Sequence, residues 1–214
     1  MMIKNKKIVV LLVIVLLALI VFLYFYSRKI EQVKLEVVST EFYPPYVTLG
    51  SKPSSITAIL KLPESYQKPR NNQILIQRVT NKVLPVGVLR DDGKNEDKVA
   101  NDNIYSGTIL VRQTVADDVH LRAVALLTPK KKAVSDEFSI ISGAAVEAGS
   151  GGTVKNSEGI AISMEPGSVD YPAFLSVKSL PAEAISAPVG KLPLKKVVKV
   201  DFRPLDPSLD VGGS

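Results

Sequence analysis

An apolar segment near the amino terminus, residues 8–26, constrains this chain more than any other feature. It reads IVVLLVIVLLALIVFLYFY and contains no charged residue, no Gly and no Pro. An α-helix rises about 1.5 Å per residue, so about twenty apolar residues cross a hydrocarbon core of about 30 Å. The segment is therefore predicted to be a single transmembrane helix, with residues 8–26 in contact with the membrane.

Basic residues on both sides of this segment indicate its orientation. Three lysines precede it and two basic residues follow it: Lys4, Lys6, Lys7, Arg28 and Lys29. Cytoplasmic flanks are enriched in Lys and Arg, and the amino terminus adds to the first group, so a cytoplasmic amino terminus is favoured. Residues 1–29 are expected to form a cytoplasmic stub and a membrane anchor. The bulk of the chain is then expected to be periplasmic or extracellular.

The end of the apolar segment bears on whether it is an anchor or a cleaved secretory signal. A cleavable signal has a shorter apolar core and ends in small residues at the cleavage site. This segment instead ends in aromatic residues of the kind that are enriched at membrane interfaces: Phe22, Tyr24, Phe25 and Tyr26. An uncleaved signal anchor is favoured, and cleavage remains the alternative.

The composition excludes several classes of site and of partner. The chain of 214 residues has no Cys, which excludes disulfides, thiolate nucleophiles and thiolate metal ligands. Its single histidine, His120, excludes multi-histidine metal sites. The formal net charge is +6, but export argues against nucleic acid as the partner and for an envelope protein or an anionic surface polymer. The identity of that partner and the oligomeric state do not follow from the sequence.

After the anchor the apolar pattern changes from continuous to alternating. Residues 119–127, for example, place five apolar side chains on one face, which is typical of a strand with one buried side. Helix signals are missing, and Pro, Gly, Asn and Asp separate about seven expected strands. These strands are expected at residues 33–37, 56–62, 73–79, 83–90, 104–112, 119–127 and 138–141. The predicted fold is all-β, with an immunoglobulin-like antiparallel β-sandwich over residues 30–142.

The densest group of oxygen-bearing side chains lies between two of these strands, in residues 90–105. Calcium takes about six to eight oxygen ligands from a flexible loop. The candidate ligands are Asp91, Asp92, Asn95, Asp97, Asn101 and Asp102. Their spacing differs from that of an EF-hand, whose loop needs a Gly at its sixth position and a closing Glu. The alternative is a turn-rich loop, because Asp, Asn and Gly tolerate left-handed backbone and bond to nearby main chain.

The same loop carries a family motif. Its residues are Leu89-Arg90-Asp91-Asp92-Gly93, then Asp97, Ala100, Asp102 and Tyr105-Ser106-Gly107, with Asn101 and Asn103 at positions where the motif usually has Gly. This pattern resembles a bacterial surface-protein module known as choice-of-anchor X, whose members join an immunoglobulin-like domain to an anchoring device. The resemblance covers about residues 33–141. It implies a role facing the envelope and transfers no catalytic residues.

A second module is expected after residues 143–151, which are small and Gly-rich and are predicted to form a linker. From the end of this linker the sequence reads Gly151-Gly152-Thr153-Val154. It continues with the stretch from Gly159 to Val169, in which Ile160, Ile162 and Met164 occupy alternate positions. Both stretches are similar to the start of the ZU-type β domain of ankyrins and netrin receptors. The resemblance implies a partial ZU-like β domain over residues 152–214, with further strands at 173–180 and 197–203. The last of these strands is expected to be an exposed edge.

Motifs of common enzymes are absent from the sequence. There is no G-x-S-x-G elbow, no H-E-x-x-H pair and no P-loop. The chain is therefore predicted to be a non-enzymatic protein of adhesion, scaffolding or envelope assembly. Two alternatives remain: a membrane-tethered hydrolase of the Ser/Lys-peptidase type, for which Ser163 or His120 needs a partner, and a carbohydrate-binding module.

Overall fold

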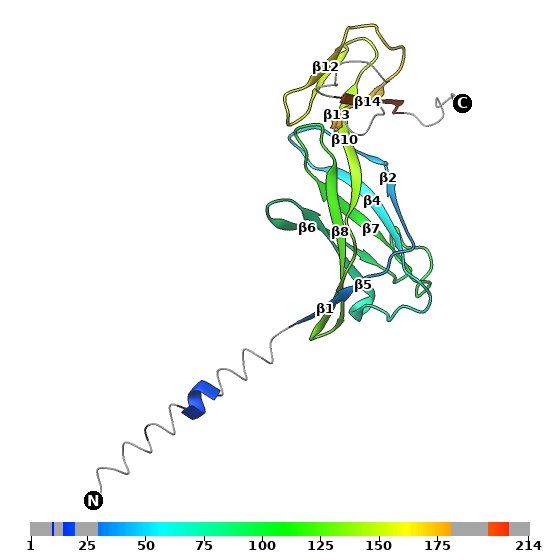
Figure 1. Cartoon of the computed structure of the whole chain (residues 1–214). Coiled ribbons are helices and arrows are strands. Elements are labelled where there is room, and N and C mark those ends of the chain that lie inside the picture. The colour runs from blue at the N-terminus through cyan, green and yellow to red at the C-terminus, as the bar shows by residue number, and fades with distance from the viewer. Residues whose placement is uncertain (1–9, 11–14, 20–29, 181–196, 206–214) are drawn as a thin grey trace, which may run out of the picture.

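The computed structural model describes residues 10, 15–19, 30–180 and 197–205, and these residues are mostly β (Figure 1). They form one twelve-stranded sheet and one two-stranded sheet, so the prediction of an all-β fold is confirmed. A short 3-10 turn, η1 (Arg70–Asn72), precedes β5. The strands are β1 (Glu31–Lys34), β2 (Ser39–Tyr43), β3 (Tyr46–Thr48), β4 (Ser54–Lys61), β5 (Gln73–Val79), β6 (Val83–Arg90), β7 (Ile104–Val111), β8 (Val119–Thr128), β9 (Lys131–Val134), β10 (Phe138–Val146), β11 (Gly152–Lys155), β12 (Ala161–Met164), β13 (Ala173–Leu180) and β14 (Val197–Pro204).

Most of the predicted membrane-spanning segment, residues 8–26, lies outside the described residues. Residues 10 and 15–19 of this segment are described and are helical. Within the described part of the chain, no helix is both long enough and apolar enough to cross a bilayer. The single transmembrane helix therefore stays a prediction.

Alternate residues of the twelve-stranded sheet point into one apolar core, which we call the first core. The inward residues of β8 are almost completely buried, so the buried face predicted for residues 119–127 is confirmed. Neighbouring strands of this sheet follow the order β10-β8-β5-β6-β7-β4-β2. Strands at both ends of this order contribute side chains to the first core, so the sheet curves around it. Burial of each large aliphatic side chain stabilises the fold by about 1.5–3 kcal/mol. The fully buried side chains include Ile56, Leu60, Ile74, Ile76, Leu89, Tyr105, Ile109 and Leu121.

The three amino-terminal strands connect the two sides of this curved sheet. β1 pairs in parallel with β9, β2 pairs antiparallel with β4, and β3 pairs in parallel with β10. Because β9 and β10 both neighbour β8 whereas β4 neighbours β7, the chain crosses from one side to the other and back. These crossings cover edges that would otherwise expose unpaired backbone groups.

β10 continues beyond the first core and corrects part of the linker prediction. Residues 143–146, expected to begin the linker, are the last residues of this strand. The linker prediction is therefore wrong for residues 143–146. A Gly at position 143 suggests flexibility, but its missing side chain instead lets β10 pack closely against β13. A Cβ at Gly143 would lie 2.3 Å from the carbonyl oxygen of Leu175 and 2.7 Å from the Cζ atom of Phe174. This approach allows β10 to pair with β13.

A smaller apolar group, which we call the second core, lies between β10, β11 and β13. Its buried members are Ala116, Val146, Val154, Leu175 and Val177. Ala116 comes from the loop between β7 and β8, so residues from both predicted modules meet in this core. Three side chains predicted to alternate inward do pack against it: Ile160, Ile162 and Met164. In Figure 1, β1 and the group formed by β12, β13 and β14 lie at opposite ends of the strand-built part of the protein.

Candidate functional site

The acidic loop between β6 and β7 brings three carboxylates together. One oxygen from each of Asp91, Asp97 and Asp102 lies within 4.8 Å of the others. Asp91 directly follows β6 and is 0% exposed, and Asp97 is 4% exposed, whereas Asp102 lies closer to solvent. Buried carboxylates are costly unless they accept hydrogen bonds, pair with a cation or coordinate a metal. Half of the six predicted ligands thus converge on one point.

Main-chain N–H groups satisfy part of the hydrogen-bonding capacity of Asp91. Its Oδ1 atom accepts the N–H of Asn101 and, at 3.2 Å, the N–H of Asp102. Its Oδ2 atom accepts the N–H of Asn103 at 3.2 Å. The Asp97 carboxylate accepts the N–H of Gly93 in the same way. The two buried carboxylates therefore hold the loop in its fold, because a charged acceptor strengthens each of these bonds.

Two asparagines adopt the backbone conformation that the resemblance assigns to glycine. Asn101 has φ 66° and Asn103 has φ 65°, both in the left-handed region. Asn is enriched there among residues with a Cβ atom. Replacing Gly by Asn at these two positions of the motif thus keeps the left-handed backbone at both. With this backbone, the N–H groups of residues 101–103 point at Asp91.

The other three predicted ligands are placed differently. Asp92 accepts the N–H of Lys94 at 3.1 Å in a local turn. Asn95 is exposed with φ 57°. The Oδ1 atom of Asn101 accepts hydrogen bonds from Lys68 Nζ at 3.3 Å and from the side-chain amide of Asn72 at 3.1 Å. The side chains of Asp92 and Asn101 thus make turn and loop contacts of the kind that the turn-rich alternative predicts.

Tyr105, at the start of β7, was not a predicted site residue, yet the structure places it beside the loop. It is 0% exposed, and its hydroxyl has no hydrogen-bond partner among the described residues. Burial first, and then the charge of Asp91, raises the pKa of Tyr105 to about 12. Of the three carboxylates, Asp91 is therefore the one whose charge acts on this hydroxyl. The available sequence signal was a Tyr among apolar residues immediately after the acidic loop.

β14 is the second feature with functional potential. It pairs with β13 along its whole length, and its other edge has no partner strand among the described residues. Alternate side chains on one face are substantially exposed: Val198 at 40%, Val200 at 49% and Phe202 at 41%. Val200 and Phe202 lie opposite Val177 and Leu175, which belong to the second core. An apolar row thus continues from that core to an open strand edge.

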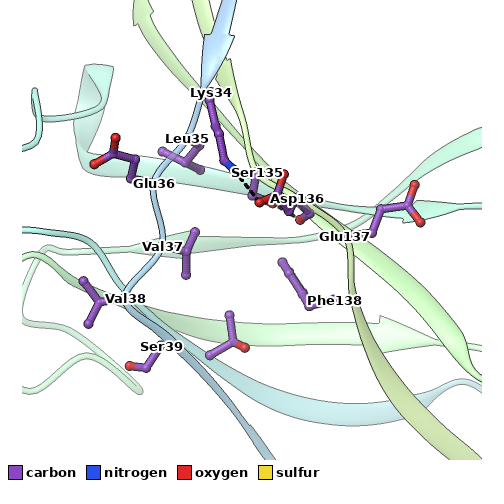
Figure 2. A pocket seen from close by; sticks show the side chains of 11 residues that line it. Lys34, Leu35, Glu36, Val37, Val38, Ser39, Ser135, Asp136, Glu137 and Phe138 are labelled. Carbon is purple, nitrogen blue, oxygen red and sulfur yellow. Dashed lines mark hydrogen bonds and ion pairs between the residues drawn. The ribbon is translucent and has the colours of Figure 1, made fainter.

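A cavity of about 390 Å³ lies where the chain crosses between β1 and β2 (Figure 2). Lys34 Nζ reaches Asp136 Oδ2 at 2.7 Å across it, and this hydrogen bond, followed by the charge of Asp136, raises the pKa of Lys34. The hydroxyl of Ser135 donates to the Asp136 carbonyl at 2.7 Å and accepts the N–H of Ala123 at 2.9 Å. Because these bonds occupy its hydroxyl, Ser135 is not an activated nucleophile in this arrangement.

The residues named for the hydrolase alternative stand apart from this cavity. His120 is exposed on β8, and its imidazole makes no hydrogen bond or ion pair within the described residues. Ser163 is exposed on β12, where its Oγ lies 2.8 Å from Thr153 Oγ1. A serine hydrolase needs a base within hydrogen-bonding reach of its nucleophile. Thr153 is not a base, so Ser163 lacks that contact in this structure.

Comparison with known proteins adds no family assignment. No protein-family model matches the chain, and no curated protein matches it significantly. The resemblances to the choice-of-anchor X module and to the ZU-type domain therefore stay predictions from the sequence.

Proposed function

We propose that this chain is a membrane-anchored extracytoplasmic protein that acts in cell-surface adhesion, scaffolding or envelope assembly. The open edge of β14 is the observation on which the proposal rests. Among the described residues no strand pairs with this edge, and the strand also carries the apolar row Val198, Val200 and Phe202. An extended segment of a second envelope protein is the partner suited to this edge, because strand addition supplies backbone hydrogen bonds while alternate side chains give selectivity.

The arrangement of the chain supports an outward-facing role for that edge. β1 begins at Glu31, a few residues after the predicted anchor, so the first strand lies near the membrane surface in this proposal. β14 belongs to the group of strands at the end opposite to β1 (Figure 1). In this proposal the open edge is held away from the lipid surface. Another envelope component therefore has access to it.

The first module is proposed to be an immunoglobulin-like sandwich. The sheet runs without a break from β2 through β4, β7, β6, β5 and β8 to β10, and strands along this path contribute buried side chains to the first core. An immunoglobulin-like fold likewise encloses one core between antiparallel strands. In β-sandwich proteins of this type, binding is commonly a property of edges and loops on a rigid scaffold.

Site-specific photo-crosslinking in intact cells tests the role of β14. A photoreactive residue at Val200 is expected to give a discrete adduct with an envelope protein, and Phe202→Asp in the same chain is expected to abolish it. Leu110, which is exposed at 56% on β7, is the matched control position and is expected to give no such adduct. Equal adducts at both positions, or none at Val200, would contradict the proposed interaction.

Membrane fractionation tests the location separately. The full chain is expected to stay with the membrane after a high-salt wash and to be cut by protease added outside spheroplasts. Recovery of a soluble polypeptide that begins near residue 30 would show a cleaved signal and contradict the anchor. The crosslinking result is independent of this outcome, so the two parts of the proposal fail separately.

A further inference from the structure

We propose that Asp91, Asp97 and Asp102 bind one Ca²⁺ ion, with the Tyr105 hydroxyl beside the ion. The donor set is made of oxygen atoms only, which suits a hard divalent cation. Calcium lies about 2.3–2.6 Å from its ligand atoms, so oxygens on opposite sides of one ion are about 4.8 Å apart. The three carboxylates already lie within that span of one another.

The charge balance of the triad supports a cation. Among the described residues, none of the three carboxylates forms an ion pair. Lys68 is close enough to reach the loop, but its Nζ donates to the side chain and carbonyl of Asn101. Backbone N–H groups carry only partial charge, so they compensate the two buried carboxylates incompletely. A divalent ion would neutralise most of this charge at a single point.

Tyr105 provides the independent observation. Its hydroxyl is completely buried, has no partner among the described residues and lies within the field of Asp91. An unpartnered buried hydroxyl costs about 1–3 kcal/mol. An ion in the triad gives this oxygen a favourable neighbour, either directly or through a coordinated water, and so accounts for a polar group that the apolar core leaves unpaired.

The competing explanation is that backbone N–H groups alone complete the loop. In that case Asp91 and Asp97 are structural acceptors and no ion is required. The two explanations differ in a measurable way, because the structural one predicts no saturable metal binding by the protein. They also differ for Tyr105, which transfers excitation energy to a bound lanthanide only if the ion lies beside it.

Metal binding by the full-length chain in detergent micelles distinguishes them. Calorimetric titration with CaCl₂ is expected to give one site per chain, with a dissociation constant of about 10⁻⁴–10⁻³ M, the range of extracellular modules. Asp97→Asn is expected to weaken binding about tenfold or more, because ligand charge sets affinity. Asp92→Asn, in the same loop but outside the triad, is the matched control and is expected to bind as the wild type does. Absence of saturable heat for the wild type, or equal binding by Asp97→Asn, would overturn the proposal.

Terbium luminescence locates the ion and does not depend on a variant that weakens the loop. The chain has seven Tyr and no Trp, so emission excited through Tyr reports a tyrosine near the metal. Wild-type protein is expected to sensitise Tb³⁺ emission that excess Ca²⁺ removes. Tyr105→Phe is expected to lose most of this emission. Unchanged emission from Tyr105→Phe would place the ion elsewhere and overturn the assignment to the triad.

Discussion

Asp91 and Asn103 are twelve positions apart, and the Oδ2 atom of Asp91 accepts the backbone N–H of Asn103 at 3.2 Å. This contact joins the end of β6 to the start of β7 and closes the acidic loop. It depends on a buried charge and on a left-handed backbone at the same time. Each dependence gives a separate test.

Removal of the Asp91 charge should open the loop. Asp91→Asn keeps the size of the side chain but replaces one accepting oxygen with an N–H₂ group that faces backbone donors. We expect the free energy of unfolding to fall by about 2–4 kcal/mol, measured by urea denaturation with EDTA present. Asp92→Asn should change it by less than about 1 kcal/mol, because within the described part of the chain that side chain makes a single local hydrogen bond. Equal losses in the two variants would contradict a special role for Asp91.

Asn103 should tolerate Gly but not a β-branched residue. At φ 65°, Asn103→Gly removes the steric restriction on the backbone, and we expect stability to stay within about 1 kcal/mol of the wild type. Asn103→Val should cost about 1–3 kcal/mol, because a β-branched side chain is strained in this region. Thermal unfolding followed by circular dichroism measures both changes. Equal stabilities of Asn103→Val and Asn103→Gly would contradict a required left-handed backbone at this position.

Close packing at Gly143 should make even a methyl group destabilising. Gly143→Ala places a Cβ 2.3 Å from the Leu175 carbonyl oxygen, so β10 and β13 must separate. We expect a loss of about 1–3 kcal/mol together with greater hydrogen exchange at the backbone of β13. Gly149→Ala is the control: no atom lies within 4 Å of its Cβ position, and the change should be neutral or slightly stabilising. A destabilised Gly149→Ala with an unaffected Gly143→Ala would refute this account of the junction.

Tyr105 should make the fold sensitive to alkaline pH. Its pKa is about 12 in the folded protein and close to 10 in an unfolded chain, so the folded state binds its proton more tightly. The contribution to stability is complete below about pH 10 and is lost as the pH rises through 12, a fall of about 2–3 kcal/mol. Denaturation in urea with EDTA, repeated from about pH 9 to pH 12, measures this fall. Tyr105→Phe, which has no proton to lose, should show a shallower decline; an identical decline would rule out Tyr105 as the cause.

Local alternation was sufficient to locate most strands. The ranges expected at residues 73–79, 83–90 and 173–180 coincide with β5, β6 and β13, because each has one apolar face and is bounded by turn residues. The acidic loop was also evident as a group of side chains. What alternation did not reveal were β2, β3 and β9, which are short and owe their extended form to pairing with strands distant in the chain.

The sequence by itself determined an all-β chain with a loop rich in carboxylates, because strand periodicity and side-chain chemistry are local properties. Only the tertiary structure decided that Asp91, Asp97 and Asp102 converge, whereas Asp92 bonds in a local turn and Asn101 bonds to Asn72. Convergence depends on left-handed turns and on bonds between residues ten or more positions apart, which spacing does not encode. For the same reason, the role of Gly143 in packing rather than in flexibility emerged only when β13 was placed against it.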